Sequence, residues 1–354
     1  MNGMLRIVGL AIGLLTLSSA ARADTPDAIA KVLSGFKGTV VVATADKIVW
    51  TTSTPNPPCL QDAASITLCH PRSPGEVEWP WASVTKQVVA TLVMQQVEAG
   101  RIALDASASR YLSGWNGNLP APTVRQLLQH RAGLRNPNDS VLDAAGSPSF
   151  YTTGPNGHSW CLTGRASPGG KWQYNNCDYI VLGAVLERVT KVDIARLFAR
   201  NTARPLELKQ ARFVRRGDSA PNLVAGSVME LAPYGAAGAL AGTPNELVTF
   251  DRALLAGKLL KAATQATMWK GDPALGFMAL GQWSFEAKPK DCAAPLRIVE
   301  RRGGIGKTQV RNILLPDRGI SVIVFLDDPD FDFGEIWQGK GLSHDLLAAA
   351  ACAP

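Results

Sequence analysis

Residues 83–100, SVTKQVVATLVMQQVEAG, form the stretch of sequence that says most about the fold. Its apolar residues recur with the spacing of an α-helix, and Gly100 ends the pattern. They are Val84, Val88, Val89, Leu92, Val93 and Val97. We therefore predict a helix over about 83–99 with one buried face. Ser83 and Lys86, three residues apart, would then lie one above the other at its first turn.

Ser83 and Lys86 are a candidate nucleophile and base. The amino end of a helix adds positive potential at Ser83, which suits the stabilisation of an oxyanion. A lysine held near other cations and away from water has a lowered pKa and can accept the serine proton. The alternative for Ser83 is a plain N-cap. Ser-x-x-Lys recurs at Ser34 and Lys37, but there a helix end and a strand start leave the two residues without a shared face.

Away from this helix, the chain has strand patterns at both ends and helix patterns in the middle. Strands are predicted at 38–43, 47–53, 297–301, 308–315 and 320–326. Further helices are predicted at 26–33, 123–130, 178–189, 243–255 and 342–351, and Thr243 to Glu246 reads as a capping box. We therefore expect an α/β (α+β) fold, in which an antiparallel sheet built from both chain ends, with flanking helices, lies beside an inserted helical lobe.

The composition fits one large folded domain. The 354 residues are 46% apolar and 18% charged, which excludes a disordered chain and a coiled coil. There are 36 Lys and Arg against 29 Asp and Glu, a net charge of +7, yet the basic residues are dispersed. We therefore expect a mildly cationic pocket for an anionic substrate and no nucleic-acid partner. A single domain is expected over 24–354, with a sheet lobe at about 24–82 and 243–354 and a helical lobe at about 83–242.

The first 23 residues read as a secretory signal peptide. Arg6 precedes an apolar run over 7–17, which is too short to span a bilayer, and Ala21-Arg22-Ala23 resembles a cleavage site. No cysteine follows directly, so we expect no lipid anchor. The mature protein is therefore expected to be secreted or periplasmic, without a stable membrane anchor.

Six cysteines, an even number, fit an oxidising compartment. We expect the pairs Cys59–Cys69 and Cys161–Cys177, each closing a short loop, with Cys292–Cys352 then tying down the C-terminal helix. The alternative is that one or two are buried free thiols. No Cys-x-x-Cys or His-Glu-x-x-His spacing is present, so we expect no metal site.

Two further motifs carry polar groups suited to a site. Tyr174-x-Asn176 precedes the predicted helix at 178–189, and a tyrosine and an amide two residues apart can face one cleft. The run Arg301-Arg302-Gly303-Gly304 ends a predicted strand, where cations followed by glycine let a substrate backbone lie against the strand edge. Residues 303–308, GGIGKT, end like a phosphate-binding loop, but a strand rather than a helix is predicted after them, so we discount this function. Gly-x-Ser-x-Gly is absent, which argues against an α/β-hydrolase.

Together these motifs resemble those of the serine β-lactamase and penicillin-binding protein family. The Tyr-x-Asn form is similar to its branch of class C β-lactamases, D-alanyl-D-alanine carboxypeptidases and esterases. Residues 124–134, VRQLLQHRAGL, are similar to another family segment, in which His130 has a structural place. The chain departs from the family at Arg301-Arg302-Gly303, where Lys or His, then Ser or Thr, usually precede the glycine. Arginine does not deprotonate, so a proton-relay role at Arg301 is excluded.

The resemblance implies a hydrolase that forms an acyl-enzyme on Ser83 and needs no cofactor. Lys86 and Tyr174 would share the general-base role, and Asn176 would orient the substrate. Backbone N–H groups of Ser83 and Gly304 would form the oxyanion hole beside Gly303, and Arg301 would bind a substrate carboxylate. The expected substrate is a D-alanyl peptide derived from peptidoglycan. A small ester, an amide or a β-lactam is the second possibility, and a cell-wall-binding homologue that has lost catalysis is the third.

Overall fold

The computed structural model describes residues 25–53, 77–115, 117–154, 156–218 and 231–352, and the backbone of two short strands, β3 (Leu60–Gln61) and β4 (Thr67–Leu68). In this part of the chain, no helix is both long and apolar enough to cross a bilayer. The expected signal peptide, Cys59 and Cys69 lie outside the described residues.

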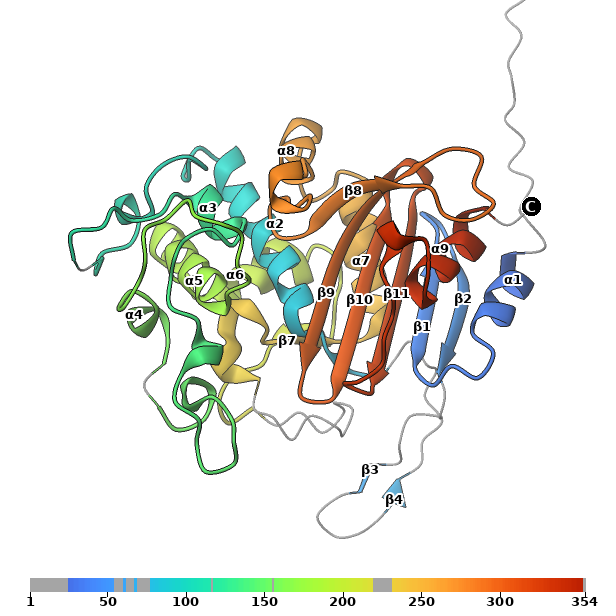
Figure 1. Cartoon of the computed structure of the whole chain (residues 1–354), viewed down its shortest axis with the longest axis horizontal. Helices are drawn as coiled ribbons and strands as arrows, with labels where there is room; N and C mark the ends of the chain where they lie inside the picture. The colour runs from blue at the N-terminus through green and yellow to red at the C-terminus, as the bar shows by residue number, and fades with distance from the viewer. Residues whose placement is uncertain are drawn as a thin grey trace, which may run out of the picture.

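A six-stranded antiparallel sheet fills the right half of the molecule in Figure 1, in the order β2-β1-β11-β10-β9-β8. The strands are β1 (Thr39–Ala43), β2 (Ile48–Ser53), β8 (Trp283–Ala287), β9 (Leu296–Ile305), β10 (Thr308–Leu315) and β11 (Ile320–Asp327). The first strand lies beside the last, with Val40 opposite Val324. The prediction of an antiparallel sheet built from both chain ends is confirmed.

The sheet is buried on both faces, and its side chains alternate between two cores. Val41 and Phe325 belong to the core shared with the helical lobe and α7 (Pro244–Leu255). Val40, Val42 and Val324 point the other way, into the core under α1 (Thr25–Val32) and α9 (Leu342–Cys352). This alternation is the period of two that a strand imposes on its side chains, and it explains why these strands are apolar throughout.

The helical lobe occupies the left half of Figure 1, and α2 (Thr85–Glu98) runs between it and the sheet. Its other helices are α3 (Val124–Leu128), α4 (His158–Cys161), α5 (Asn176–Thr190), α6 (Ile194–Phe198) and a π-helical turn, Ala199–Ala203. The central helix α5 packs against α2, α3, α4 and α6. The predicted capping box at Thr243 is present, and α3 has a second one at Thr123.

Smaller elements complete the described chain. A three-stranded sheet has the order β5 (Trp79–Pro80), β7 (Leu240–Gly242), β6 (Arg212–Phe213), and α8 (Ala262–Met268) lies above α2 in Figure 1. Short 3-10 helices occur at Ala82–Val84, Ala108–Arg110, Pro137–Asp139, Ser149–Tyr151, Ala232–Ala237, Pro273–Leu275, Pro316–Arg318 and Ile336–Gln338.

The main error of the sequence prediction concerns β9. We expected this strand to cover 297–301 and its run of glycines to follow the strand end. Instead it continues to Ile305, since Gly303 pairs with Val310 and Gly304 with Gln309 on β10. A strand, and not a helix, follows Lys307, so this segment lacks the strand–loop–helix geometry of a phosphate-binding loop.

Candidate active site

Ser83 lies in the 3-10 turn Ala82–Val84, which leads into α2. Ala82, just before it, has a φ of 45°, in the left-handed region that residues other than glycine rarely adopt. Backbone strain of this kind persists only where the surrounding structure enforces it, and it is frequent at functional sites. The Ser83 side chain is half-buried, and neither this turn nor α2 has a side-chain N-cap bond, so Ser83 is not a helix cap.

Gly303 allows β9 to approach this turn closely. A Cβ atom placed on Gly303 would lie 2.8 Å from the Ser83 backbone nitrogen and 2.6 Å from a methyl group of Val310. Both distances are shorter than real Cβ contacts, so only glycine fits here without displacing the nucleophile. Gly304, the next residue, is exposed and lines the cleft in front of Ser83.

Lys86 is fully buried at the second residue of α2, and its Nζ atom lies at the centre of the predicted polar groups. Nζ is 3.0 Å from Ser83 Oγ, 2.6 Å from the Tyr174 hydroxyl, 2.7 Å from Asn176 Oδ1 and 2.7 Å from the Ala237 carbonyl oxygen. The Ser83 and Tyr174 oxygens are themselves 2.5 Å apart. The two sequence motifs, 91 residues apart, therefore form one hydrogen-bonded cluster.

The hydrogen-bonding capacity of these four partners suits a neutral amine at Lys86. Asn176 Oδ1 and the Ala237 carbonyl only accept hydrogen bonds, so they take the two N–H bonds of a neutral amine. The remaining lone pair then faces the hydroxyl groups of Ser83 and Tyr174, both of which can donate. A neutral amine, with two protons and one lone pair, and an ammonium ion, with three protons, each satisfy three of the four contacts, so burial and nearby charge decide between the two forms.

The surroundings of Lys86 favour the same neutral state. Burial lowers the pKa of Lys86 well below its ordinary value, and the nearby positive charge of Arg301 lowers it further. Asp178 opposes this effect more weakly. The sequence prediction that cations and burial lower the pKa of this lysine agrees with both causes.

Tyr174 and Asn176 are held by the start of α5. Asn175 is the N-cap of this helix, because its side chain accepts a hydrogen bond from the Cys177 N–H. The capping geometry places Tyr174 just outside the helix and Asn176 at its first position. We predicted that this helix begins at 178, so the sequence analysis placed its start two residues too late and left Asn176 outside it.

Arg301 lies behind the nucleophile and not in the cleft. Its side chain is fully buried, and its Nε donates a hydrogen bond of 3.0 Å to the Ser83 carbonyl oxygen. The guanidinium group also lies 5.6 Å from the Tyr174 ring centre and 5.4 Å from that of Trp283. The sequence analysis expected Arg301 to bind a substrate carboxylate, but in this buried position its side chain does not reach the cleft. It acts instead on the charge state of its buried neighbours.

Arg302 faces the opposite side of β9, because successive strand residues alternate. It forms paired hydrogen bonds with the buried Glu300 at 2.8 and 3.0 Å and with Glu335 at 2.7 and 2.5 Å. The pKa of Arg302 is raised by these two carboxylates. Arg302 is therefore paired with two carboxylates on the face of β9 opposite to Arg301, and it does not line the cleft.

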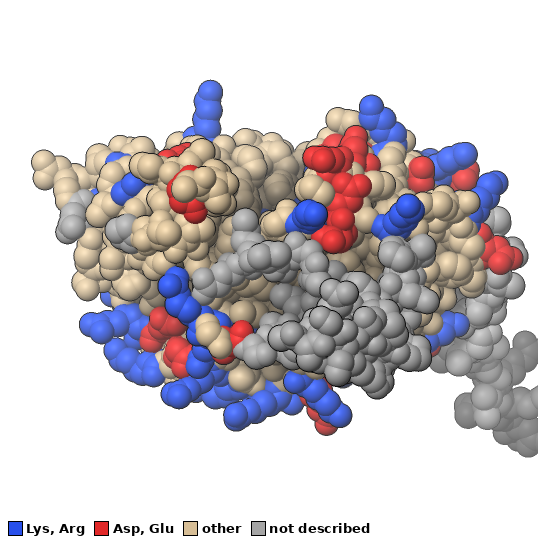
Figure 2. Space-filling view, turned by 90° about the horizontal axis from the view of Figure 1, so that it is seen from below, with Lys and Arg blue, Asp and Glu red and all other residues tan. Residues whose placement is uncertain are grey.

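A cleft of about 370 Å³ opens in front of Ser83. Its polar lining includes Asn138, Tyr174, Asn176 and Tyr234, and the β9–β10 hairpin contributes Gly304, Ile305, Gly306, Thr308 and Gln309. Among the described lining residues, none has a charged side chain. The expectation of a cationic pocket is therefore wrong for the described lining. On the face shown in Figure 2, Lys and Arg side chains gather at the lower left, on the outer surface of the helical half.

The sequence analysis did not assign Tyr151, Asp178 or Tyr234 to this site, because no motif marks them. Tyr234 lines the cleft and stacks on Tyr151, with ring centres 4.0 Å apart and an interplanar angle of 9°. Asp178 is fully buried 3.0 Å from Nδ1 of His130, whose ring packs against that of Tyr174 at 4.8 Å. Only the resemblance of residues 124–134 pointed to this region, where it gave His130 a structural place.

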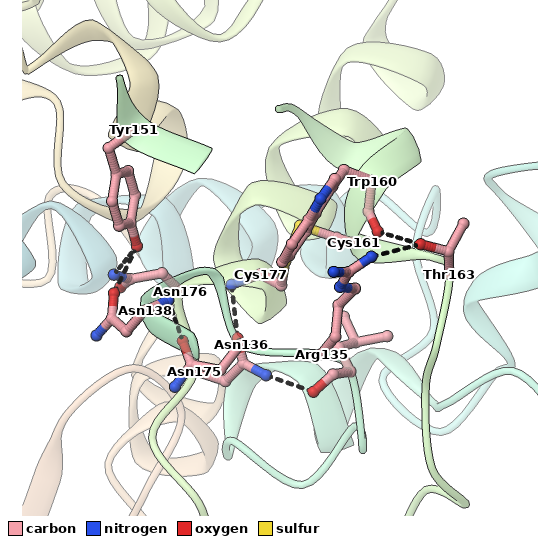
Figure 3. Close-up of a disulfide and its surroundings, with 11 residues drawn as sticks. Arg135, Asn136, Asn138, Tyr151, Trp160, Cys161, Thr163, Asn175, Asn176 and Cys177 are labelled. Carbon is pink, nitrogen blue, oxygen red and sulfur yellow. Dashed lines mark hydrogen bonds between the residues drawn. A yellow bond between two sulfur atoms is a disulfide. The ribbon is translucent and has the colours of Figure 1, made fainter. Parts of the chain in front are cut away.

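Two disulfides support the site and the sheet. Cys161 on α4 is joined to Cys177 on α5, directly after Asn176, as Figure 3 shows. Cys292, between β8 and β9, is joined to Cys352 at the end of α9. Both pairings are among those expected from the sequence.

Comparisons with known proteins identify similar sequences. The Beta-lactamase family model matches residues 38–338. Esterase EstB of Burkholderia gladioli is 34% identical over 148 residues, and a putative D-alanyl-D-alanine carboxypeptidase of Salmonella heidelberg is 27% identical over 177 residues. These matches cover 38% and 46% of the chain, but the chain spans only 38% and 40% of the lengths of these two relatives.

A solved structure supports the fold. The β-lactamase/D-alanine carboxypeptidase from Yersinia pestis, complexed with citrate, aligns with a TM-score of 0.69 and 18% sequence identity. The alignment covers 92% of this chain and 98% of the other. Because the family model covers most of the chain and the site joins the Ser-x-x-Lys and Tyr-x-Asn motifs, the chain belongs to the β-lactamase family, in which its relatives are named as hydrolases.

Proposed function

We propose that the protein is an exported serine hydrolase that acts on neutral esters or amides through an acyl-enzyme on Ser83. The observation that carries this proposal is the fully buried Lys86 Nζ, which lies 3.0 Å from Ser83 Oγ and 2.6 Å from the Tyr174 hydroxyl, where burial and the charge of Arg301 favour the neutral amine. A lysine in this state is a base that is poised to take the serine proton.

In acylation, Ser83 Oγ attacks the carbonyl carbon of the substrate, and its proton passes to Lys86 directly or through the Tyr174 hydroxyl. The carbonyl oxygen becomes an oxyanion, for which the backbone N–H groups of Ser83 and Gly304 are the proposed donors. Collapse of this intermediate breaks the ester or amide bond, and the leaving group takes the proton from Lys86. Water then attacks the acyl-enzyme and gives a proton to Lys86; the bond to Ser83 Oγ breaks, Lys86 returns that proton to Oγ, and the acid is released.

The lining of the cleft supports a neutral substrate. A substrate carboxylate is bound most strongly by a cation, and the described lining offers polar side chains but no charged group. Arg301 is buried behind Ser83 and holds its carbonyl oxygen. We therefore rank a small ester or amide above the D-alanyl peptide that the sequence favoured. The carboxypeptidase name of one relative keeps the peptide as the second candidate.

The cellular location is part of this proposal. We infer cleavage of the expected signal peptide near Ala23 and export to the periplasm or beyond. The two disulfides support this inference, since they form and persist in oxidising compartments.

The test is covalent labelling combined with turnover of a 4-nitrophenyl ester. A fluorophosphonate should add one adduct to the peptide containing Ser83, and Ser83→Ala should lose both the adduct and the turnover. The matched control is Ser34→Ala, which removes the serine of the second Ser-x-x-Lys sequence and should change neither. If the folded wild type is neither labelled nor active on the ester, the hydrolase proposal fails and the binding homologue replaces it.

A further inference from the structure

The orientation of one side-chain amide decides whether Lys86 has a free lone pair. Asn176 accepts a hydrogen bond from Lys86 through Oδ1, at 2.7 Å, and donates through Nδ2 to the Tyr151 hydroxyl, also at 2.7 Å. If the amide were reversed, its NH₂ group would face Lys86 and donate to the lone pair. The amine would then be unable to accept the proton of the nucleophile.

Tyr151 has the hydrogen bonds needed to prevent this reversal. Its hydroxyl has one proton, which it donates to Asn138 Oδ1 at 2.8 Å, so toward Asn176 it can only accept. Figure 3 shows the Tyr151 oxygen between the Asn138 and Asn176 side chains. An accepting partner at this position fixes the NH₂ group of Asn176 toward Tyr151 and its oxygen toward Lys86.

The surroundings hold Tyr151 in place and keep it protonated. Only 5% of Tyr151 is exposed, and its ring stacks on Tyr234 in the wall of the cleft. Burial raises the pKa of the Tyr151 hydroxyl above its ordinary value, so the hydroxyl is protonated and can donate at neutral pH. The backbone of Asn138 is held by the hydrogen bond that its N–H donates to the Asn136 side chain, and its exposed side chain presents Oδ1 to the Tyr151 hydroxyl.

We propose that Tyr151 is a positioning residue that, with Asn138 as its acceptor, locks the Asn176 amide so that its oxygen faces Lys86. This inference rests on the proposed function, since it concerns the base of that reaction. The three residues come from separate segments: the 3-10 helices Pro137–Asp139 and Ser149–Tyr151, and α5.

Four variants of the full chain test the lock. Tyr151→Phe removes the hydroxyl and keeps the ring that stacks on Tyr234. Asn138→Leu removes the acceptor of the tyrosine proton, whereas Asn138→Asp keeps an acceptor there. Tyr179→Phe is the matched control, because the fully buried Tyr179 also donates its hydroxyl proton, here to the Leu128 carbonyl.

With a 4-nitrophenyl ester, Tyr151→Phe should lower kcat about tenfold or more with little change in KM. The protonated form of Lys86 loses a fixed acceptor, so the acid limb of the kcat/KM profile should move to lower pH by about one unit. Asn138→Leu should reproduce both effects, whereas Asn138→Asp, which keeps the acceptor but adds a negative charge that favours protonated Lys86, should move the limb to higher pH instead. Tyr179→Phe should lower thermal stability without moving the limb. If Tyr151→Phe matches Tyr179→Phe in both kcat and acid limb, the lock is refuted.

A second readout does not depend on turnover. The nitrogen-15 NMR signal of the Asn176 side-chain amide, assigned by its loss in Asn176→Asp, should shift or broaden in Tyr151→Phe and Asn138→Leu. It should stay in place in the Tyr179→Phe control. An unchanged signal in the first two variants overturns the lock whether or not the protein is a hydrolase. An inactive wild type whose Asn176 signal responds as expected would overturn the proposed function alone.

Discussion

The buried charge of Arg301 provides the sharpest quantitative test of the proposed mechanism. Lys86 Nζ lies 4.8 Å from the Tyr174 ring centre and the Arg301 guanidinium carbon lies 5.6 Å from the same point, so the two charges are at most about 10 Å apart. At an effective dielectric constant of about 20, two unit charges at ~10 Å repel by about 1.7 kcal/mol. That free energy corresponds to slightly more than one unit of pKa.

Replacing Arg301 with methionine should therefore raise the pKa of Lys86 by about one unit. Without the neighbouring cation, the protonated lysine is less unfavourable, so at a given pH a smaller fraction of it is the neutral base. The acid limb of the kcat/KM profile for a neutral 4-nitrophenyl ester should move to higher pH by about one unit. Arg301→Lys keeps the charge and should hold the limb near its wild-type position.

The variant also separates two roles for Arg301. An electrostatic element behind the nucleophile predicts equal losses on neutral esters and on D-alanyl-D-alanine peptides, which carry a free carboxylate. A residue that grips a carboxylate predicts a much larger loss on the peptides. Thermal unfolding of each variant controls for stability, which should change little, because within the described chain two nitrogens of the Arg301 guanidinium lack a hydrogen-bond partner. An acid limb that stays in place or moves to lower pH in Arg301→Met would refute the electrostatic argument.

Two further predictions concern the tyrosine of the cluster and the disulfides. Tyr174→Phe should lower kcat by about 10²- to 10⁴-fold, as expected for a residue that shares proton transfer, with a fluorophosphonate labelling rate reduced in parallel; an unchanged rate would remove it from the mechanism. Replacing both Cys161 and Cys177 with alanine should cost about 3 kcal/mol of unfolding free energy, measured in urea, and should also lower kcat. The Cys292 and Cys352 pair is the control: its loss should cost about 4 kcal/mol and leave kcat of the folded protein unchanged.

Much of the site could be predicted because four of its residues belong to the short motifs Ser-x-x-Lys and Tyr-x-Asn. Ser83 and Lys86 share a helix face by spacing alone, and the structure has them 3.0 Å apart. Tyr174 and Asn176 are marked as a pair by their separation of two residues. The position of Arg301 could also be assigned from the sequence, but the direction of its side chain could not. Side chains of β9 alternate between the two faces of the sheet, and that of Arg301 lies on the face that contacts Ser83. Which face each residue occupies depends on the register of β9 with β10.

Residues without a motif could not be found in the same way. Tyr151 and Asn138 lie in a region that the sequence indicates only as a loop rich in Gly, Ser, Asn and Pro. Their role arises from contacts with Asn176, which is 25 residues from Tyr151 along the chain. No periodicity reports such a contact, because side chains that meet through loop packing leave no regular spacing in the sequence.

The sequence by itself determined the longest helices and five strands of the main sheet, but not β8 or the short helices α4, α6 and α8. Helical spacing in 83–100, the capping box at Thr243 and the apolar strand runs all arise because a helix or a strand must bury its apolar residues, and that requirement acts within a few turns or residues. Tertiary structure alone decided the protonation chemistry. The lowered pKa of Lys86 depends on its complete removal from water and on a cation 215 positions away in the chain, and desolvation and charge act through space rather than along the sequence.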